Sequence, residues 1–252
     1  RAEPYFKLYL DTDKTQLTPG TNGVLFVKKK KKNGFAGEIA LEIEGLPKGV
    51  TATCGRILAS ERDGCIVLEA NKDVSNVASN ITVRGKAEHP NGDEKPLELS
   101  AIAVPYQETY QPGGGRGHWP VTMHTIAVGE PNDILAVDLS ETDITLKPGE
   151  SKKIEVTIQR AEGFDKNVQL DLLYRHLNSV YADSLPPGVT IDSKSSKTVL
   201  TGGATKGHIT LKADAKAAKT ERQQTAVMAN ISLNFVMKAT YASKPVFITV
   251  TE

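Results

Sequence analysis

The stretch LTPGTNGVLFVKKKKKNGF, residues 17–35, decides the fold because a related stretch, LKPGESKKIEVTIQRAEGF, occurs at residues 146–164. A constant offset of 129 aligns Pro19-Gly20 with Pro148-Gly149, and it aligns Gly34-Phe35 with Gly163-Phe164 without any gap. Proline-glycine pairs mark turns, and alternating apolar residues between such turns are typical of strands. The repeated stretch is therefore interpreted as a turn, a strand and a second turn that occur once in each half of the chain.

Further matches keep the same order along both halves. They are Phe6, Leu8 and Leu10 against Leu135, Val137 and Leu139; LPKGVT from Leu46 against LPPGVT from Leu185; CIVLEA from Cys65 against HITLKA from His208; and Lys95-Pro96 against Lys244-Pro245. Agreement in order at several separate places indicates an internal duplication. The last match predicts that each half ends with a strand that follows a Lys-Pro pair.

Short period-2 alternation dominates the remaining sequence, as in FKLYL at residues 6–10 and IEVTI at residues 154–158. This pattern is typical of half-buried antiparallel strands. The segment ADAKAAKTERQQT, residues 213–225, has no apolar stripe and is interpreted as a surface loop with one helical turn. Each half has about seven strands in roughly 105–120 residues, the size of an immunoglobulin-like sandwich. We therefore predict an all-β protein of two tandem immunoglobulin-like β-sandwiches: 1–106, a linker or added strand at 107–130, and 131–252.

The charge balance excludes a protein that binds nucleic acid through a general basic field. The 252 residues contain 31 Lys and Arg against 30 Asp and Glu, and the run of five lysines at residues 28–32 is therefore a local feature. The alignment places Lys29 in the inward register of Ile158, so its ammonium must snorkel past the sheet end. We interpret the run as a solvated strand end that also protects a strand edge. No apolar stretch approaches the roughly 20 residues of a membrane span.

Taken together, the pattern L-x-PG, GF and LPxGVT is similar to the Ig-like modules of large secreted and cell-envelope proteins of planctomycete-type bacteria. The resemblance covers both halves, but it consists of turn and core residues, so it predicts fold better than function. It implies an extracytoplasmic, non-catalytic spacer, adhesion or recognition role within a larger multidomain chain. The start at Arg1 agrees with a processed chain or a segment of a longer protein. No functional residue is carried over from the resemblance.

The two cysteines, Cys54 and Cys65, flank the turn ASERDG. If their strands pair as a hairpin, the two thiols come near one another, and a disulfide would suit the oxidising compartment that the resemblance implies. The alternative is two unpaired thiols. The second half has Ser193 and His208 at the corresponding positions, so the fold does not require a bridge.

Nothing in the sequence matches a catalytic signature, so no catalytic residue, metal site or cofactor is predicted. The stretch GGGRGHWP, residues 113–120, lacks the Lys-Ser/Thr ending of a phosphate loop and is interpreted as a linker. His118 and His124 are too few ligands for zinc. The sequence thus favours a binding or spacer protein over an enzyme.

Candidate binding residues lie where the two halves differ, because embellishments of a rigid frame often carry function. The segment 107–128 has no counterpart in the alignment and holds Trp119, as an interdomain wedge or a ligand-stacking ring. The second half has an insertion of ten residues after Phe164. The candidates are Trp119, Tyr174, Arg175, His176, Asn178 and Tyr181. The leading hypothesis is a non-catalytic spacer or protein-interaction module with an unidentified protein or glycan partner, and the alternative is a carbohydrate-binding module.

Overall fold

The computed structural model describes residues 4–74, 76–130, 133–176, 179–234 and 238–252, and over these ranges the protein consists of strands and one short 3-10 turn. The first group of strands is β1 (Phe6–Leu10), β2 (Lys14–Leu17), β3 (Asn22–Lys31), β4 (Ile39–Glu44), β5 (Val50–Cys54), β6 (Arg56–Ile57), β7 (Asp63–Ala70), β8 (Val77–Asn91), β9 (Glu94–Gln111), β10 (Gly115–Pro120) and β11 (His124–Val128). The second group is β12 (Ile134–Leu139), β13 (Asp143–Leu146), β14 (Ser151–Arg160), β15 (Val168–Asp171), β16 (Tyr174–His176), β17 (Ser179–Ala182), β18 (Val189–Ile191), β19 (Val199–Leu200), β20 (Lys206–Ala213), β21 (Thr220–Thr225), β22 (Met228–Ser232), β23 (Lys238–Ala242) and β24 (Val246–Val250), with the 3-10 turn η1 (Ser193–Ser195).

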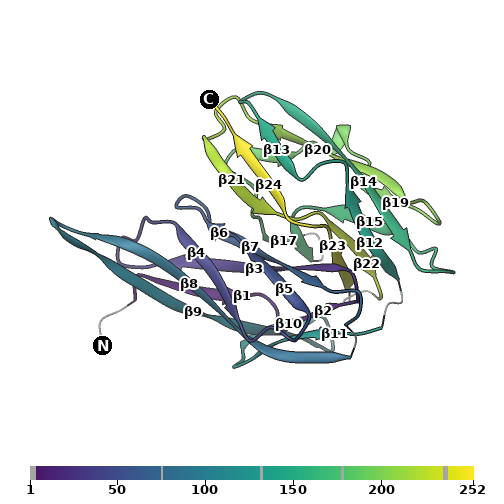
Figure 1. Cartoon of the computed structure of the whole chain (residues 1–252), viewed down its shortest axis with the longest axis horizontal. Helices are drawn as coiled ribbons and strands as arrows, with labels where there is room; N and C mark the ends of the chain where they lie inside the picture. The colour runs from purple at the N-terminus through teal and green to yellow at the C-terminus, as the bar shows by residue number, and fades with distance from the viewer. Residues whose placement is uncertain (1–3, 75, 131–132, 177–178, 235–237) are drawn as a thin grey trace.

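The first sandwich, formed by β1–β11, has two layers around one core (Figure 1). One layer has the order β1-β3-β7-β5, and the other contains β2, β11, β8 and β4. The N-terminal segment supplies a strand to each layer, since β1 runs antiparallel to β3 while β2 runs parallel to β11. Inward residues such as Leu8, Leu25, Ile39 and Ile66 alternate with outward ones and fill the space between the layers.

The second sandwich, formed by β12–β24, repeats this arrangement. One layer has the order β12-β14-β20-β18, and the other contains β13, β24 and β21, with β13 parallel to β24. The registers also agree, because Leu25 opposite Ile66 in the first sandwich corresponds to Ile154 opposite Ile209 in the second. The predicted all-β fold of two immunoglobulin-like sandwiches is confirmed, and the shared registers fit a duplication.

Glycines with positive φ occupy the turns of the motifs that the two halves share. Gly20 and Gly149 have φ values of 75° and 84°, and Gly49 and Gly188, from the two LPxGVT motifs, have 81° and 80°. Side chains with a Cβ atom rarely adopt this left-handed region. A glycine at these points is therefore a backbone requirement of the fold rather than a sign of a binding site.

The match between the two Lys-Pro pairs is wrong. Lys244-Pro245 precedes β24, which pairs with β13 in parallel, but the strand that pairs with β2 in the same way is β11. Lys95-Pro96 instead lies at the start of β9. The true extra element of the first half is the end of β9 together with β10, a hairpin inserted before β11. Most of the segment 107–130 is therefore strand and not linker.

The polar segment 213–225 ends in a strand, so the prediction of a surface loop is wrong for residues 220–225. Strand β21 pairs with β24, and Gln223, Gln224 and Thr225 are buried. The prediction failed because the buried residues of this strand are polar, so the strand lacks the hydrophobic alternation on which strand prediction relies.

The lysine run ends β3, as predicted, but Lys29 behaves differently from its neighbours. Lys29 occupies the inward register and is 5% exposed. Its ammonium does not reach water past the sheet end; it donates to the carbonyl oxygens of Leu58 (2.8 Å) and Ala59 (3.2 Å). Burial lowers the pKa of Lys29 to about 8. One lysine of the run is thus a buried, hydrogen-bonded cap on the core.

We expect the triple replacement of Lys30, Lys31 and Lys32 by glutamine to change the free energy of unfolding by less than about 1 kcal/mol, because exposed side chains contribute little. Chemical denaturation measures this change. The same variant and the unchanged chain should both fail to bind duplex DNA at moderate salt in a mobility-shift assay. Micromolar DNA binding that disappears in the variant would contradict the structural interpretation of the run.

The predicted disulfide is wrong, and both cysteines are free. The strands β5 and β7 do pair, but Cys54 lies opposite Ile66, one position away from Cys65. Side chains of successive strand residues point to opposite faces. A register offset of one residue therefore turns the two thiols to opposite sides of the sheet, with Cys54 exposed and Cys65 buried.

Candidate functional site

The outer face of the first sandwich carries an apolar cluster that the second sandwich covers. We call this the interdomain core: Phe26, Cys65, Val67, Ala182, Ala226, Met228 and Ala242, with Val24 and Tyr174 at its margin. The first three residues come from β3 and β7, and the others from β17, β22, β23 and the turn before β22. Cys65 is fully buried there, and burial raises the pKa of its thiol to about 12. The two sandwiches are thus packed against one another through buried apolar side chains.

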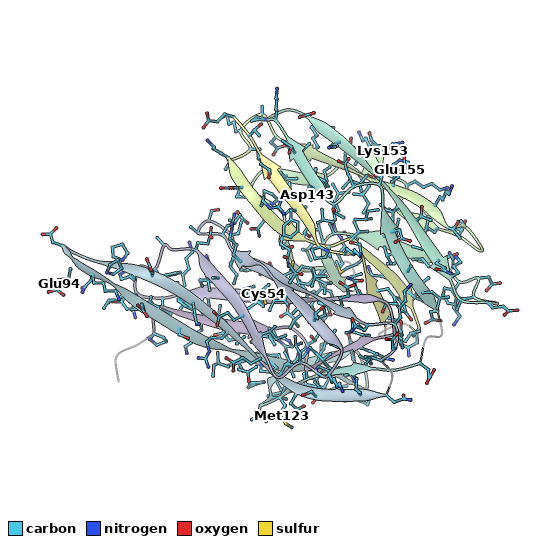
Figure 2. The ribbon with its side chains drawn as sticks, in the orientation of Figure 1. Cys54, Glu94, Met123, Asp143, Lys153 and Glu155 are labelled. Atoms are coloured by element: carbon cyan, nitrogen blue, oxygen red, sulfur yellow. The ribbon has the colours of Figure 1, made fainter. Side chains whose placement is uncertain are left out.

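The corresponding face of the second sandwich is polar. Lys153 and Glu155 of β14 stand at the positions of Val24 and Phe26 and project from the outer surface, as Figure 2 shows. His208 and Thr210 of β20 replace Cys65 and Val67. A sandwich cannot dock on this face through a dry apolar contact of the same kind. The two halves therefore differ at the face where the first sandwich receives the second.

Buried glutamines of β21 fix the second sandwich to the edge of the first. The Gln224 Nε2 donates to the carbonyl oxygens of Thr53 (2.8 Å) and Cys65 (3.3 Å), and the Gln223 Nε2 donates to that of Arg56 (3.4 Å). A glutamine amide satisfies carbonyl groups that would otherwise be buried without a partner. The sequence prediction missed these two residues. Their role is visible only in the structure, where both are polar and yet buried.

A buried carboxylate adds a second polar contact between the sandwiches. Asp63 in β7 pairs with Arg62 at 2.8 Å, and its Oδ2 accepts a hydrogen bond from the backbone N–H of Asp183 at 3.0 Å. Arg62 in turn donates to the carbonyl oxygen of Tyr181 at 3.0 Å. Because each group has a partner, the contact is specific as well as apolar.

The two insertions, which were the predicted binding regions, contact each other. The guanidinium carbon of Arg116 in β10 lies 5.0 Å from the ring centre of Tyr181 in β17, and the Lys28 ammonium lies 5.4 Å from the same ring. The Tyr174 ring stacks on Phe26 at 5.9 Å. Burial, assisted by Asp11 and Glu108, raises the pKa of Tyr174 to about 12. The structure therefore places Tyr174 and Tyr181 in the contact between the sandwiches.

Of the remaining candidates of the second insertion, Arg175 is described in full and is exposed. The Arg175 Nε donates to Asp171 Oδ2 at 2.8 Å, so its charge is already paired. His176 ends β16, but its side chain is outside the described part of the structure, as is the whole of Asn178. A binding role for Arg175, His176 and Asn178 stays a prediction.

Trp119 lies apart from this contact, so the interpretation as an interdomain wedge is wrong. Its side chain is 57% exposed, and its indole Nε1 donates to Thr109 Oγ1 at 3.2 Å. The same nitrogen would lie 2.4 Å from a Cβ atom placed on Gly117. The absence of a side chain at Gly117 therefore lets the ring fold back over the hairpin. The other alternative, a ring that stacks on a ligand, stays a prediction.

His124 is a buried histidine of the first sandwich and does not share a face with His118. The His124 Nδ1 is 2.9 Å from the carbonyl oxygen of Thr12, and Nε2 is 2.9 Å from Thr15 Oγ1. The carbonyl can only accept, so Nδ1 carries the proton. Burial lowers the pKa of His124 despite this contact and nearby Asp13. The histidine thus joins β11 both to β2, through Thr15, and to the segment before it, through Thr12.

We expect acid to destabilise the protein through His124. Because the folded-state pKa lies below the unfolded value, the unfolded chain binds more protons, and stability is lost as pH falls below about 6.5. Unfolding midpoints in denaturant at several pH values between 5 and 7.5 measure this loss. The variant His124→Gln should show a smaller slope over the same range. A free energy of unfolding that is constant or rises on acidification would contradict the assignment.

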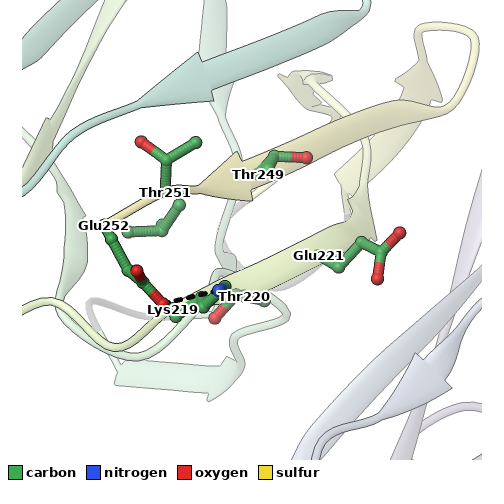
Figure 3. A pocket seen from close by; sticks show the side chains of 7 residues that line it. Lys219, Thr220, Glu221, Thr249, Thr251 and Glu252 are labelled. Carbon is green, nitrogen blue, oxygen red and sulfur yellow. Dashed lines mark hydrogen bonds and ion pairs between the residues drawn. The ribbon is translucent and has the colours of Figure 1, made fainter.

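Neither of two open hollows on the described surface gathers groups of complementary chemistry. One, of about 320 Å³, lies at the end of β21 and β24, where Lys219 pairs with Glu252 at 2.6 Å (Figure 3). The other, of about 550 Å³, lies along β4, β8 and β9, beside the ion pair of Lys86 with Glu42. Among the described residues, no cluster of three or more His, Cys, Asp or Glu side chains is arranged to hold a metal. Likewise, none of them forms a helix with the length and apolarity that crossing a membrane requires.

Several solved structures match the chain, each at low identity and a low TM-score. The sialic acid-binding region of a Streptococcus sanguinis adhesin is 11% identical over 99% of this chain and 78% of that one, with a TM-score of 0.27. The D0-D1 region of intimin is 11% identical over 96% and 97%, with a TM-score of 0.27. Domains 4–9 of the surface layer protein SbsC are 11% identical over 100% and 32%, with a TM-score of 0.33. At such TM-scores the likeness supports no conclusion about function.

No protein-family model and no curated protein matches the chain. The fold class therefore rests on strand order and register, and the evidence on function comes from the surface and from the contact between the sandwiches.

Proposed function

We propose that the chain is a non-catalytic, rigid pair of immunoglobulin-like domains that acts as a spacer or adhesion module of an extracytoplasmic bacterial protein. The observation that carries the proposal is the interdomain core. Phe26, Cys65 and Val67 replace the exposed polar residues expected on an outer sheet face, and the second domain covers them. A fixed angle between the domains suits a rigid spacer, and it suits an adhesion module that must present a surface in one orientation.

Both insertions support the same role. The β9–β10 hairpin and the β16–β17 hairpin meet through Arg116 and Tyr181, so the elements that differ between the copies brace the joint. The extracytoplasmic location rests on the resemblance of the turn motifs alone, since the free cysteines remove the expected disulfide. The partition 1–106, 107–130 and 131–252 and the larger multidomain context likewise remain proposals, as does the planctomycete-type family.

Small-angle scattering of the whole chain tests the rigidity on which the proposal depends. We expect the curve calculated from one arrangement of the domains to fit at both low and high salt, because an apolar contact is insensitive to screening. Iodoacetamide labelling adds a local measure, with Cys54 reacting quickly and Cys65 staying protected in the native protein. Scattering that requires an ensemble of separated domains would overturn the proposal.

A further inference from the structure

The β9–β10 hairpin presents two faces of different chemistry. Residues opposite one another on paired strands share a face. Glu108 and Arg116 lie on the face that meets the second domain, and they form an ion pair with each other. His118 lies on the same face and stacks on Tyr106 at 4.7 Å. All the charge of the hairpin is therefore on the side that faces the interdomain contact.

The opposite face carries no charged side chain. Its three cross-strand pairs are Gln107 with Trp119, Thr109 with Gly117, and Gln111 with Gly115. Gln107, Gln111 and Trp119 are exposed. The loop that joins the strands, residues 112–114, is Pro-Gly-Gly and adds no charge. This face, which we call the Trp119 face, combines one large aromatic ring with neutral amide groups.

The ring on this face is held in place before any ligand binds. The hydrogen bond to Thr109 satisfies the only polar atom of the indole, and Gly117 leaves the space into which the ring folds. A ring fixed in this way loses little conformational entropy on binding. Among the described strands, β10 pairs with β9 alone, and its contact with Tyr181 of β17 is made by Arg116 on the opposite face. The Trp119 ring itself is 57% exposed.

We propose that the Trp119 face binds an uncharged glycan whose pyranose ring stacks on the indole, while Gln107 and Gln111 hydrogen-bond its hydroxyls. A sugar ring presents an apolar C–H face and polar edges, which matches a flat aromatic ring beside amide groups. An acidic glycan would find no cation on this face to pair with. The inference rests on the proposed function, because it names what the rigid pair of domains presents.

Trp119 is the only tryptophan of the chain, so its fluorescence reports on this site alone. The probes are the neutral hexasaccharides cellohexaose, chitohexaose and mannohexaose, with hexagalacturonate as the acidic arm and an alternating Val-Thr octapeptide as the strand-addition arm. We expect a saturable fluorescence change with at least one neutral hexasaccharide, with a dissociation constant on the order of 0.01–1 mM.

Calorimetry of variants assigns the binding to the site. Trp119→Ala should weaken the neutral glycan about tenfold or more, as truncation of a central aromatic does. Gly117→Ser should weaken it with the tryptophan still present, because the added Cβ displaces the ring. The matched control is Val199→Ala, an exposed apolar residue of the second domain, which should bind unchanged.

Three outcomes would overturn the inference. They are no response to any neutral hexasaccharide, binding that survives Trp119→Ala, or a stronger response to hexagalacturonate or to the octapeptide. Scattering and Cys65 labelling are measured without ligand, so a rigid protein that binds no glycan refutes this inference and leaves the proposed function standing. A flexible protein that binds a neutral glycan refutes the proposed function and leaves the glycan site on the Trp119 face standing.

Discussion

Replacing Phe35 with alanine is expected to lower the free energy of unfolding by about 3–5 kcal/mol, the usual cost of removing a buried phenylalanine. Phe35 is 2% exposed and packs 4.9 Å from the ring centre of Phe6 at one end of the first sandwich. The loss has two parts. One is the free energy of transferring the phenyl ring from water to the core, and the other is the cost of the cavity left between the layers. Denaturant unfolding followed by circular dichroism measures it.

The repeat supplies a matched control for this variant. Phe164 aligns with Phe35, but it is only partly buried, and the Arg160 guanidinium carbon lies 5.4 Å from its ring centre. The two aligned phenylalanines are thus buried to different extents. Phe164→Ala should therefore destabilise the protein by clearly less than Phe35→Ala. Equal losses would show that the two sites are packed alike and would contradict the structure.

Replacing Val67 with lysine should separate the two domains while leaving each one folded. Val67 is buried in the interdomain core, on the face of β7 that points away from the first hydrophobic core. A lysine ammonium buried there without a partner costs several kcal/mol of free energy. Separation of the two domains returns the ammonium to water and removes this cost. We expect the Cys65 thiol to lose its burial, its pKa to fall toward the ordinary value, and labelling to become fast.

Labelling kinetics with mass spectrometry measures this opening, and scattering should show a larger radius of gyration. The exposed Val199→Lys variant controls for an added charge and should leave Cys65 protected. Circular dichroism distinguishes opening from unfolding, because strand content should be retained. A Val67→Lys protein in which Cys65 stays protected and the scattering is unchanged would contradict the described contact.

The sequence alone determined the class of fold and the equivalence of the two halves. The Pro-Gly, Gly-Phe and LPxGVT motifs are local, because a positive φ or a turn is satisfied within a few residues of chain. The sequence also predicted that Lys29 points inward. Strand side chains alternate between the two faces, and the aligned residue in the second half is the apolar Ile158.

Only the tertiary structure decided what the outward residues do. Val24 and Phe26 look like ordinary strand residues in the sequence, and nothing local shows that a second domain covers them. The disulfide prediction failed for the same reason. Cys54 lies opposite Ile66 and not opposite Cys65, and this register between β5 and β7 cannot be read from the sequence. Gln223 and Gln224 are buried by partners more than 150 residues away in the chain. Local sequence patterns indicate turns and the alternation of side chains along a strand. Contacts between distant strands decide which sheet face is covered and which one, like the Trp119 face, stays exposed.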